Sequence, residues 1–228
     1  MKSLERMDAG LYAYLRGYLS EARLARFEHI LDNRTRHFTL VLEDIFHAPN
    51  AGAVIRTCEC FGVQDIYVIE NSKPFQLNTR VVRGSAKWTT LRRTDSSEQC
   101  VEELRAAGYR IAATTLREDK PLISPEDVPV DEKVALCMGS EETGLSDYIH
   151  EQADYYVHIP MYGFTQSLNI SVSAALCLRA MLAKLRDSNV DWRLSEDEKQ
   201  QLREHWVQHS VKHLDVLLRH YDIAYFTK

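Results

Sequence analysis

The sequence lacks the features of several common protein classes. No apolar run approaches the length of a membrane-spanning helix, and the first residues, MKSLERMDAG, lack the apolar core of a signal peptide. Neither G-x-G-x-x-G after a predicted strand nor G-x-x-x-x-G-K-S/T is present, which argues against a Rossmann dinucleotide site and a P-loop. We therefore expect a cytoplasmic protein with no membrane partner and neither of these nucleotide sites.

Metal-binding and disulfide patterns are also missing. The five cysteines are odd in number and lie mostly in apolar segments, which favours buried free thiols. Cys58 and Cys60 form C-x-C without a second cysteine pair. Four histidines recur near the C-terminus: His205, His209, His213 and His220. A solvated helical face explains them better than a metal site, because no carboxylate partner is evident. We expect no bound metal.

Acidic residues are absent from one long stretch of an acidic chain. The net charge is −5, yet residues 71–94 contain no Asp or Glu. Six cations lie there: Lys73, Arg80, Arg83, Lys87, Arg92 and Arg93. A solvated basic face would also explain them, but so long an acid-free stretch in this chain favours a phosphate-binding surface. The cations that we expect to bind phosphate are Arg80, Arg83 and Lys87.

The rest of the pattern alternates between strand and helix. Strand patterns cover residues 37–46, 65–70, 109–115, 133–139 and 154–160. Helical patterns cover residues 50–62, 95–108 and 145–153 and the second half of 159–182. This alternation predicts an α/β fold, a mostly parallel sheet with helices on both faces. We expect a helical extension at 1–36, the core at 37–186 and a second helical extension, of one or two helices, at 187–228.

Helix ends can be placed from single residues. Gly62 and Gly108 follow the helical patterns and suit the left-handed conformation that often ends a helix. Asp95 and Glu98 have the spacing of a capping box at the start of the helix at 95–108.

Three segments carry candidate functional residues, and each follows a predicted strand. They read HAPNAGAVIRT, MGSEETG and IPMYGFTQSLNISVSAALCL. In open α/β sheets, ligands bind beyond the carboxyl ends of the strands. Taken singly, Asn50 and Ser167 could be helix caps, and Gly139 and Gly144 could be turn glycines. Arg56 is harder to dismiss, because a guanidinium in a small, apolar helix needs a partner or water.

Together and in this order, the three segments resemble the SpoU/TrmH family of the SPOUT superfamily. The resemblance covers about residues 38–186. It implies an RNA ribose 2′-O-methyltransferase that uses S-adenosylmethionine. The helical additions on both sides, without a separate N-terminal RNA-binding domain, are most similar to the branch that methylates the D-loop guanosine (position 18) of tRNA.

The resemblance also implies a deep trefoil knot at the C-terminal end of the core and a homodimer formed through it. True knots are otherwise almost absent from proteins. Residues 167–175 are mostly small or polar, whereas a core helix would normally carry more bulk. A helix inside a knot has backbone close to it on several sides, and small residues permit that approach.

The same resemblance assigns residues to the site. It places the cofactor against Thr114, Gly139, Ile159, Met161 and Leu168. It places Asn50, Arg56, Glu141, Ser167 and Asn169 in the reaction centre. It also makes RNA the ligand of Arg80, Arg83 and Lys87. Because an arginine guanidinium stays protonated, we expect Arg56 to hold the adjoining phosphate and to stabilise the developing alkoxide rather than to act as a literal general base.

Other functions remain open from the sequence. The substrate could be an rRNA ribose rather than tRNA. The chain could also be a catalytically inactive RNA-binding protein of the same fold, although family-type residues fill all the named catalytic positions. A third alternative is a small-molecule enzyme whose basic stretch is accidental. Binding of S-adenosylmethionine would separate a methyltransferase from the last two.

Overall fold

The computed structural model describes residues 7–45, 47–71, 84–117 and 119–226, with the backbone alone for 222–226. The chain divides into two compact units. Residues 35–192 form one unit. The described parts of Met1–Arg34 and Arg193–Lys228, the two ends of the chain, form the other. We call them the core and the terminal unit.

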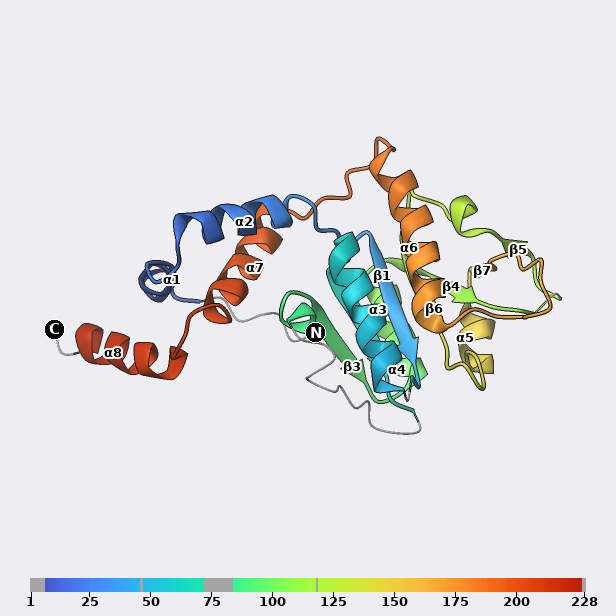
Figure 1. The fold of residues 1–228 in the computed structure, drawn as a ribbon, viewed down its shortest axis with the longest axis horizontal. Coiled ribbons are helices and arrows are strands. Elements are labelled where there is room, and N and C mark those ends of the chain that lie inside the picture. The colour runs from blue at the N-terminus through green and yellow to red at the C-terminus, as the bar shows by residue number, and fades with distance from the viewer. Residues whose placement is uncertain (1–6, 46, 72–83, 118, 227–228) are drawn as a thin grey trace. The chain divides into compact units, whose positions relative to one another are not determined.

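A parallel sheet runs through the core (Figure 1). Among the described residues it has seven strands in the order β3-β2-β1-β6-β4-β7-β5, and every neighbouring pair is parallel. The strands are β1 (Phe38–Glu43), β2 (Asp65–Ile69), β3 (Thr90–Thr94), β4 (Tyr109–Thr114), β5 (Leu122–Ile123), β6 (Lys133–Met138) and β7 (Tyr155–Val157). The predicted parallel sheet is confirmed, but the two edge strands β3 and β5 were not anticipated.

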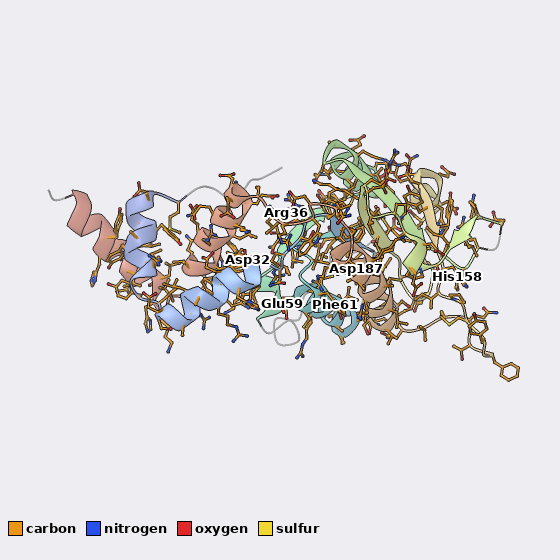
Figure 2. The ribbon with its side chains drawn as sticks, turned by 90° about the horizontal axis from the view of Figure 1, so that it is seen from above. Asp32, Arg36, Glu59, Phe61, His158 and Asp187 are labelled. Atoms are coloured by element: carbon orange, nitrogen blue, oxygen red, sulfur yellow. The ribbon has the colours of Figure 1, made fainter. Side chains whose placement is uncertain are left out.

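Helices cover both faces of this sheet (Figure 1). One hydrophobic cluster joins the sheet to α3 (Ala48–Phe61) and α6 (Ile170–Arg186). The other joins its opposite face to α4 (Ser97–Ala106) and α5 (Asp147–Gln152). Every residue of β1 is buried, as expected for a central parallel strand. The C-terminal ends of α3 and α6 meet where Arg186 Nη2 donates to the Phe61 carbonyl at 2.6 Å (Figure 2).

Two of the expected helix ends agree with the structure, and one expected helix start differs. Gly108 follows α4 with a φ of 84°, in the left-handed region, as expected. Helix α3 ends at Gly62, whose φ of 85° lies in the left-handed region, as expected. The cap of α4 is Ser96 and not Asp95, because the Ser96 side chain accepts the hydrogen bond from Gln99 N. The capping box expected at Asp95 and Glu98 was therefore wrong by one position.

The terminal unit consists of helices from both ends of the chain. It contains α1 (Ala9–Arg16), α2 (Glu21–Leu31), α7 (Glu196–Gln208) and α8 (Leu214–Phe226). Its packing joins the two ends: Arg203 pairs with Glu28 at 2.8 Å, and the rings of Phe27 and Trp206 pack edge to face. The C-terminal segment thus forms two helices, and segments almost 200 residues apart share one small core.

Among the described residues, no helix combines the length and the apolar character needed to cross a membrane. The trefoil knot implied by the resemblance stays a prediction.

Candidate functional site

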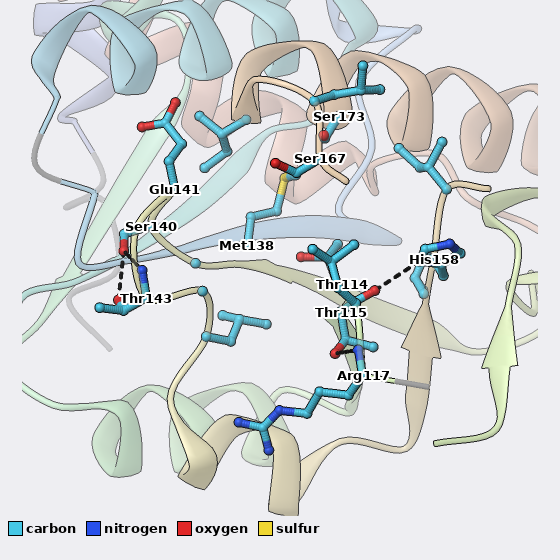
Figure 3. A pocket seen from close by; sticks show the side chains of 18 of the residues that line it. Thr114, Thr115, Arg117, Met138, Ser140, Glu141, Thr143, His158, Ser167 and Ser173 are labelled. Carbon is cyan, nitrogen blue, oxygen red and sulfur yellow. Dashed lines mark hydrogen bonds between the residues drawn. The ribbon is translucent and has the colours of Figure 1, made fainter. Parts of the chain in front are cut away.

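A cavity of about 370 Å³ opens at the carboxyl edge of the sheet (Figure 3). Its walls come from the segments that follow β4, β6 and β7 and from the start of α6. Because parallel strands all end at the same edge, segments far apart in the sequence meet there. The volume is typical of cavities that bind a cofactor-sized molecule.

All five residues predicted to bind the cofactor line this cavity. They are Thr114, Gly139, Ile159, Met161 and Leu168. Thr114 donates its hydroxyl to the Cys137 carbonyl at 2.9 Å, which fastens the end of β4 to β6. The geometry brings these residues together, and their role in binding stays a prediction.

Gly139 is required by a close approach of the backbone. A Cβ at this position would lie 2.1 Å from the carbonyl carbon of Gly144 and 2.2 Å from Leu145 N. The segment 139–145, the cofactor loop, therefore folds back onto its own beginning. Gly144 N donates to the Ser140 carbonyl at 2.9 Å, and the φ of Gly144 is +70°.

Three of the predicted reaction-centre residues, Asn50, Glu141 and Asn169, form one hydrogen-bonded cluster, which we call the motif cluster. The Asn50 side chain donates to Glu141 Oε1 at 2.5 Å. Asn169 Nδ2 lies 3.2 Å from Glu141 Oε1 and 3.2 Å from Asn50 Oδ1. Asn169 also caps α6 by accepting from Ser171 N, and Asn50 lies in the first turn of α3. Each of the three sequence motifs thus contributes one side chain.

The other two predicted residues stand apart from this cluster. Ser167 is exposed and lines the cavity. Arg56 is exposed on α3, almost two turns after Asn50. Within the described residues, neither side chain forms a hydrogen bond or an ion pair. Arg56 therefore presents its guanidinium to solvent, six residues after Asn50 on the same helix.

Two histidines near the cavity were not anticipated. His150 is buried, with Nδ1 2.9 Å from the Ser146 carbonyl and Nε2 3.1 Å from Thr115 Oγ1. The carbonyl can only accept, so Nδ1 carries a proton and donates to it; in a neutral ring, Nε2 then accepts from the Thr115 hydroxyl. His158 Nδ1 lies 3.1 Å from the Thr115 carbonyl (Figure 3). No spacing in the sequence marks the two contacts with Thr115, because they join residues 35 and 43 positions apart.

The cavity offers neither an ionised thiol nor a metal cluster within the described residues. Burial raises the pKa of Cys177, in the cavity wall, to about 12, so its thiol stays protonated. No group of three or more histidine, cysteine or acidic side chains in the described part of the chain could hold a metal ion. Among the described residues, the polar side chains that line the cavity carry hydroxyls, two imidazoles (His150 and His158), two carboxylates (Glu141 and Glu142) and the guanidinium of Arg117.

The acid-free stretch is only partly described. Arg80 and Arg83, together with Lys73, lie outside the described residues. Lys87 lies before β3, at the amino edge of the sheet, with its ammonium 4.5 Å from the centre of the Trp88 ring.

Two cations of the same stretch are paired with acids from elsewhere. Arg92 pairs with the buried Asp65, and Arg93 pairs with Glu70. These two charges are partly neutralised, so they contribute less to a phosphate-binding surface than their number suggested.

Comparisons with known proteins define the class. The SpoU rRNA methylase family model matches residues 37–179, and the chain belongs to this family. A tRNA (guanosine(18)-2′-O)-methyltransferase of Borreliella burgdorferi is 41% identical over 86% of this chain and 88% of its own length. A protein of the same name from Aquifex aeolicus is 30% identical over 84% of this chain and 91% of its own length.

Solved structures agree with this assignment. The crystal structure of the A. aeolicus TrmH/SpoU tRNA modifying enzyme superposes with a TM-score of 0.74 at 29% identity, covering 84% of this chain and 98% of that one. The methyltransferase AviRb from Streptomyces viridochromogenes, in complex with AdoMet, shares the fold at a TM-score of 0.60 and 23% identity, over 69% of this chain and 64% of that one. The resemblance to the SpoU/TrmH family is confirmed.

Proposed function

We propose that this chain is a tRNA guanosine-2′-O-methyltransferase that uses S-adenosylmethionine and modifies guanosine 18 in the D-loop. The observation that carries the proposal is the joining of Asn50, Glu141 and Asn169, one from each sequence motif, next to a cavity at the carboxyl edge of the sheet. The name shared by the relatives from B. burgdorferi and A. aeolicus supports the substrate.

The cavity fits S-adenosylmethionine on physical grounds. Its walls combine apolar side chains such as Met138, Ile159 and Leu168 with hydroxyls such as Thr114 and Ser167, which suits a ligand with an aromatic base and a polar ribose, and Gly139 leaves no room for even a methyl group. Thr114, Gly139, Ile159, Met161 and Leu168 would hold the adenosine part. When bound, S-adenosylmethionine supplies a methyl group already activated on a sulfonium. The protein therefore has two tasks: to align the ribose and to help its 2′-hydroxyl lose a proton.

Arg56 performs the electrostatic part of this work. It lies on the solvent side of α3 with no protein partner among the described residues, so its planar guanidinium can grip the adjoining phosphate. The same positive charge stabilises the alkoxide that develops as the proton leaves, which is the kind of interaction that lowers a barrier most. Ser167, at the rim of the cavity, contacts the ribose.

The motif cluster holds the segments that carry these groups in fixed positions relative to one another. Glu141 accepts from both Asn50 and Asn169, so it ties the cofactor loop to the first turn of α3 and to the start of α6. Alignment of this kind can supply several kcal/mol of rate enhancement, because reacting atoms must approach within about 3.5 Å.

The acid-free stretch, with Arg80, Arg83 and Lys87, binds tRNA phosphates. Changing all three to Gln should weaken tRNA binding and flatten its salt dependence by roughly 0.7 to 0.9 in log–log slope for each phosphate that is no longer neutralised. Binding of S-adenosylmethionine should not change. An unchanged slope would move the RNA surface to the arginines near the N-terminus. Of these, Arg16, Arg23 and Arg26 are exposed, whereas Arg34 is buried and Arg36 pairs with Asp65.

A second copy of the chain covers the outer face of α6. Val172 and Leu176 lie one turn apart there and are 45% and 47% exposed. Leu176 also borders a second cavity, lined by Ile159 and Pro160 among others. Since Ile159 lines the cofactor cavity as well, a homodimer through this face would place the partner directly behind the cofactor.

The compartment we propose is the cytoplasm, where tRNA is available.

The test is methyl transfer from labelled S-adenosylmethionine by the purified chain. One substrate is a tRNA with guanosine at position 18, and the matched control carries 2′-deoxyguanosine there. The proposal predicts label in the first RNA and none in the second. An rRNA fragment is a third arm, because the matching family model is named for rRNA. If only the rRNA fragment is labelled, rRNA and not tRNA is the substrate.

A further inference from the structure

Glu43 is a buried carboxylate that no sequence motif singled out. It ends β1 and is only 2% exposed. Its oxygens accept from Ser146 N and Ser146 Oγ, both at 2.7 Å, and from Ser97 Oγ. A fourth and longer hydrogen bond comes from Asn71 Nδ2 at 3.4 Å. A carboxylate is buried at great cost unless its oxygens are hydrogen-bonded, and these donors supply that compensation.

Two of the donors belong to Ser146, next to the segment that builds the cofactor cavity. Ser146 directly follows the cofactor loop, and its hydroxyl caps α5 by accepting from Ile149 N. At the other end of the loop, Met138 in β6 pairs with Leu42, the residue before Glu43. Two consecutive residues of β1 therefore hold the two ends of the cofactor loop.

Glu43 itself does not line the cavity. Any effect of Glu43 on cofactor binding must therefore pass through the cofactor loop. That loop begins with Gly139, and the side chain of Glu141 in the loop belongs to the motif cluster. We propose that Glu43 is a positioning residue for the cofactor site, which holds the cofactor loop in its binding conformation through Ser146. This inference rests on the proposed function, since it concerns the same cavity.

The variant Glu43→Gln tests the inference with little change in size. A carboxamide is neutral and has one oxygen instead of two, so the hydrogen bonds from Ser146 lose their charge assistance and the serine hydroxyls must turn to accept from the NH2 group. The matched control is Glu204→Gln in the terminal unit. Glu204 is also buried, at 5% exposure, and accepts from Met7 N and from Gln200 Nε2, each at 3.0 Å.

Both variants should lower the midpoint of thermal unfolding. Only Glu43→Gln should weaken binding of S-adenosylmethionine in calorimetry, by about tenfold, the loss expected from one misplaced charge-assisted hydrogen bond. Two further variants show whether the effect of Glu43 on the cofactor loop passes through Ser146. Ser146→Ala should reproduce the weaker binding of S-adenosylmethionine, whereas Ser97→Ala should reduce stability only. Combined with Glu43→Gln, Ser146→Ala should add little.

Three results would overturn the inference. The first is a Glu43→Gln variant that binds S-adenosylmethionine within twofold of the wild type. The second is equal effects of Ser146→Ala and Ser97→Ala on binding, which decides the matter even if Glu43→Gln does not fold. The third is a wild-type chain that binds no S-adenosylmethionine at all. That result needs no substitution, so it is recognised separately as the failure of the proposed function.

Discussion

Replacing Gly139 by alanine would disturb the cofactor loop in a way that the structure quantifies. The added Cβ would lie 2.1 to 2.2 Å from three backbone atoms, two of Gly144 and one of Leu145. Backbone atoms cannot rotate aside as a side chain can. An ordinary carbon–carbon separation is about 3.5 Å, so the crossing segment must move by more than ~1 Å. Overpacking of this kind costs about 1–3 kcal/mol.

That strain should appear in cofactor binding, because both crossing segments of the loop border the cavity. A cost of about 1–3 kcal/mol corresponds to a rise of roughly 5- to 160-fold in the dissociation constant of S-adenosylmethionine. Calorimetry at 25 °C measures it, and a thermal unfolding curve shows whether the variant remains folded.

Gly163→Ala is the matched control for this change. An added Cβ there meets nothing within 4 Å, and the φ of Gly163 is not positive. Its dissociation constant should stay within about twofold of the wild type, since nothing has to move. If Gly139→Ala and Gly163→Ala bind equally well, the loop is soft enough to absorb the methyl group, and the argument from close approach is refuted.

Three further outcomes are expected. Arg56→Ala should reduce kcat by about 100-fold or more while the affinity for S-adenosylmethionine stays within about twofold. Arg56→Lys should also have a low kcat. An Arg56→Ala variant that keeps most of its turnover would remove Arg56 from the mechanism. Leu176→Glu should turn a dimer into a monomer in sedimentation, and a wild type that is monomeric and fully active would contradict the interface. Burial, with a contribution from His209, lowers the pKa of His205 to about 4, below its ordinary value of 6.5. Protonation then favours the unfolded state, so stability should fall as pH drops from about 6.5 towards 4, and His205→Gln should flatten that slope in urea titrations.

The strand-end motifs could be predicted from sequence because their physics is local. Apolar runs give the central strands, and the parallel arrangement then brings Asn50, Glu141 and Asn169 to one edge. The edge strands could not be found in this way. β3 lies at the end of the acid-free stretch as TLRRT, and its arginines look like a free basic surface until Asp65 and Glu70 are seen beside them.

Other parts of the site depend on interactions between distant segments. Gly139 looks like a turn glycine in the sequence, whereas the reason for it is the backbone of Gly144 passing against it. Glu43 would be expected at the surface as the charged end of a strand, and only the fold shows that serines from two helices bury it. Hydrogen bonds between residues 54 and 103 positions apart leave no periodic signal in one sequence.

The central claim is that this chain transfers a methyl group to a tRNA ribose through Arg56. Mass mapping of ribose methylation in total RNA tests it most directly, in cells that lack the gene for this chain and are complemented with either the wild type or Arg56→Ala. The account predicts 2′-O-methylguanosine at position 18 of tRNA with the wild type and its absence with the variant. The same methylation in both strains, or a wild-type-dependent methyl group found only in other RNA, would contradict it.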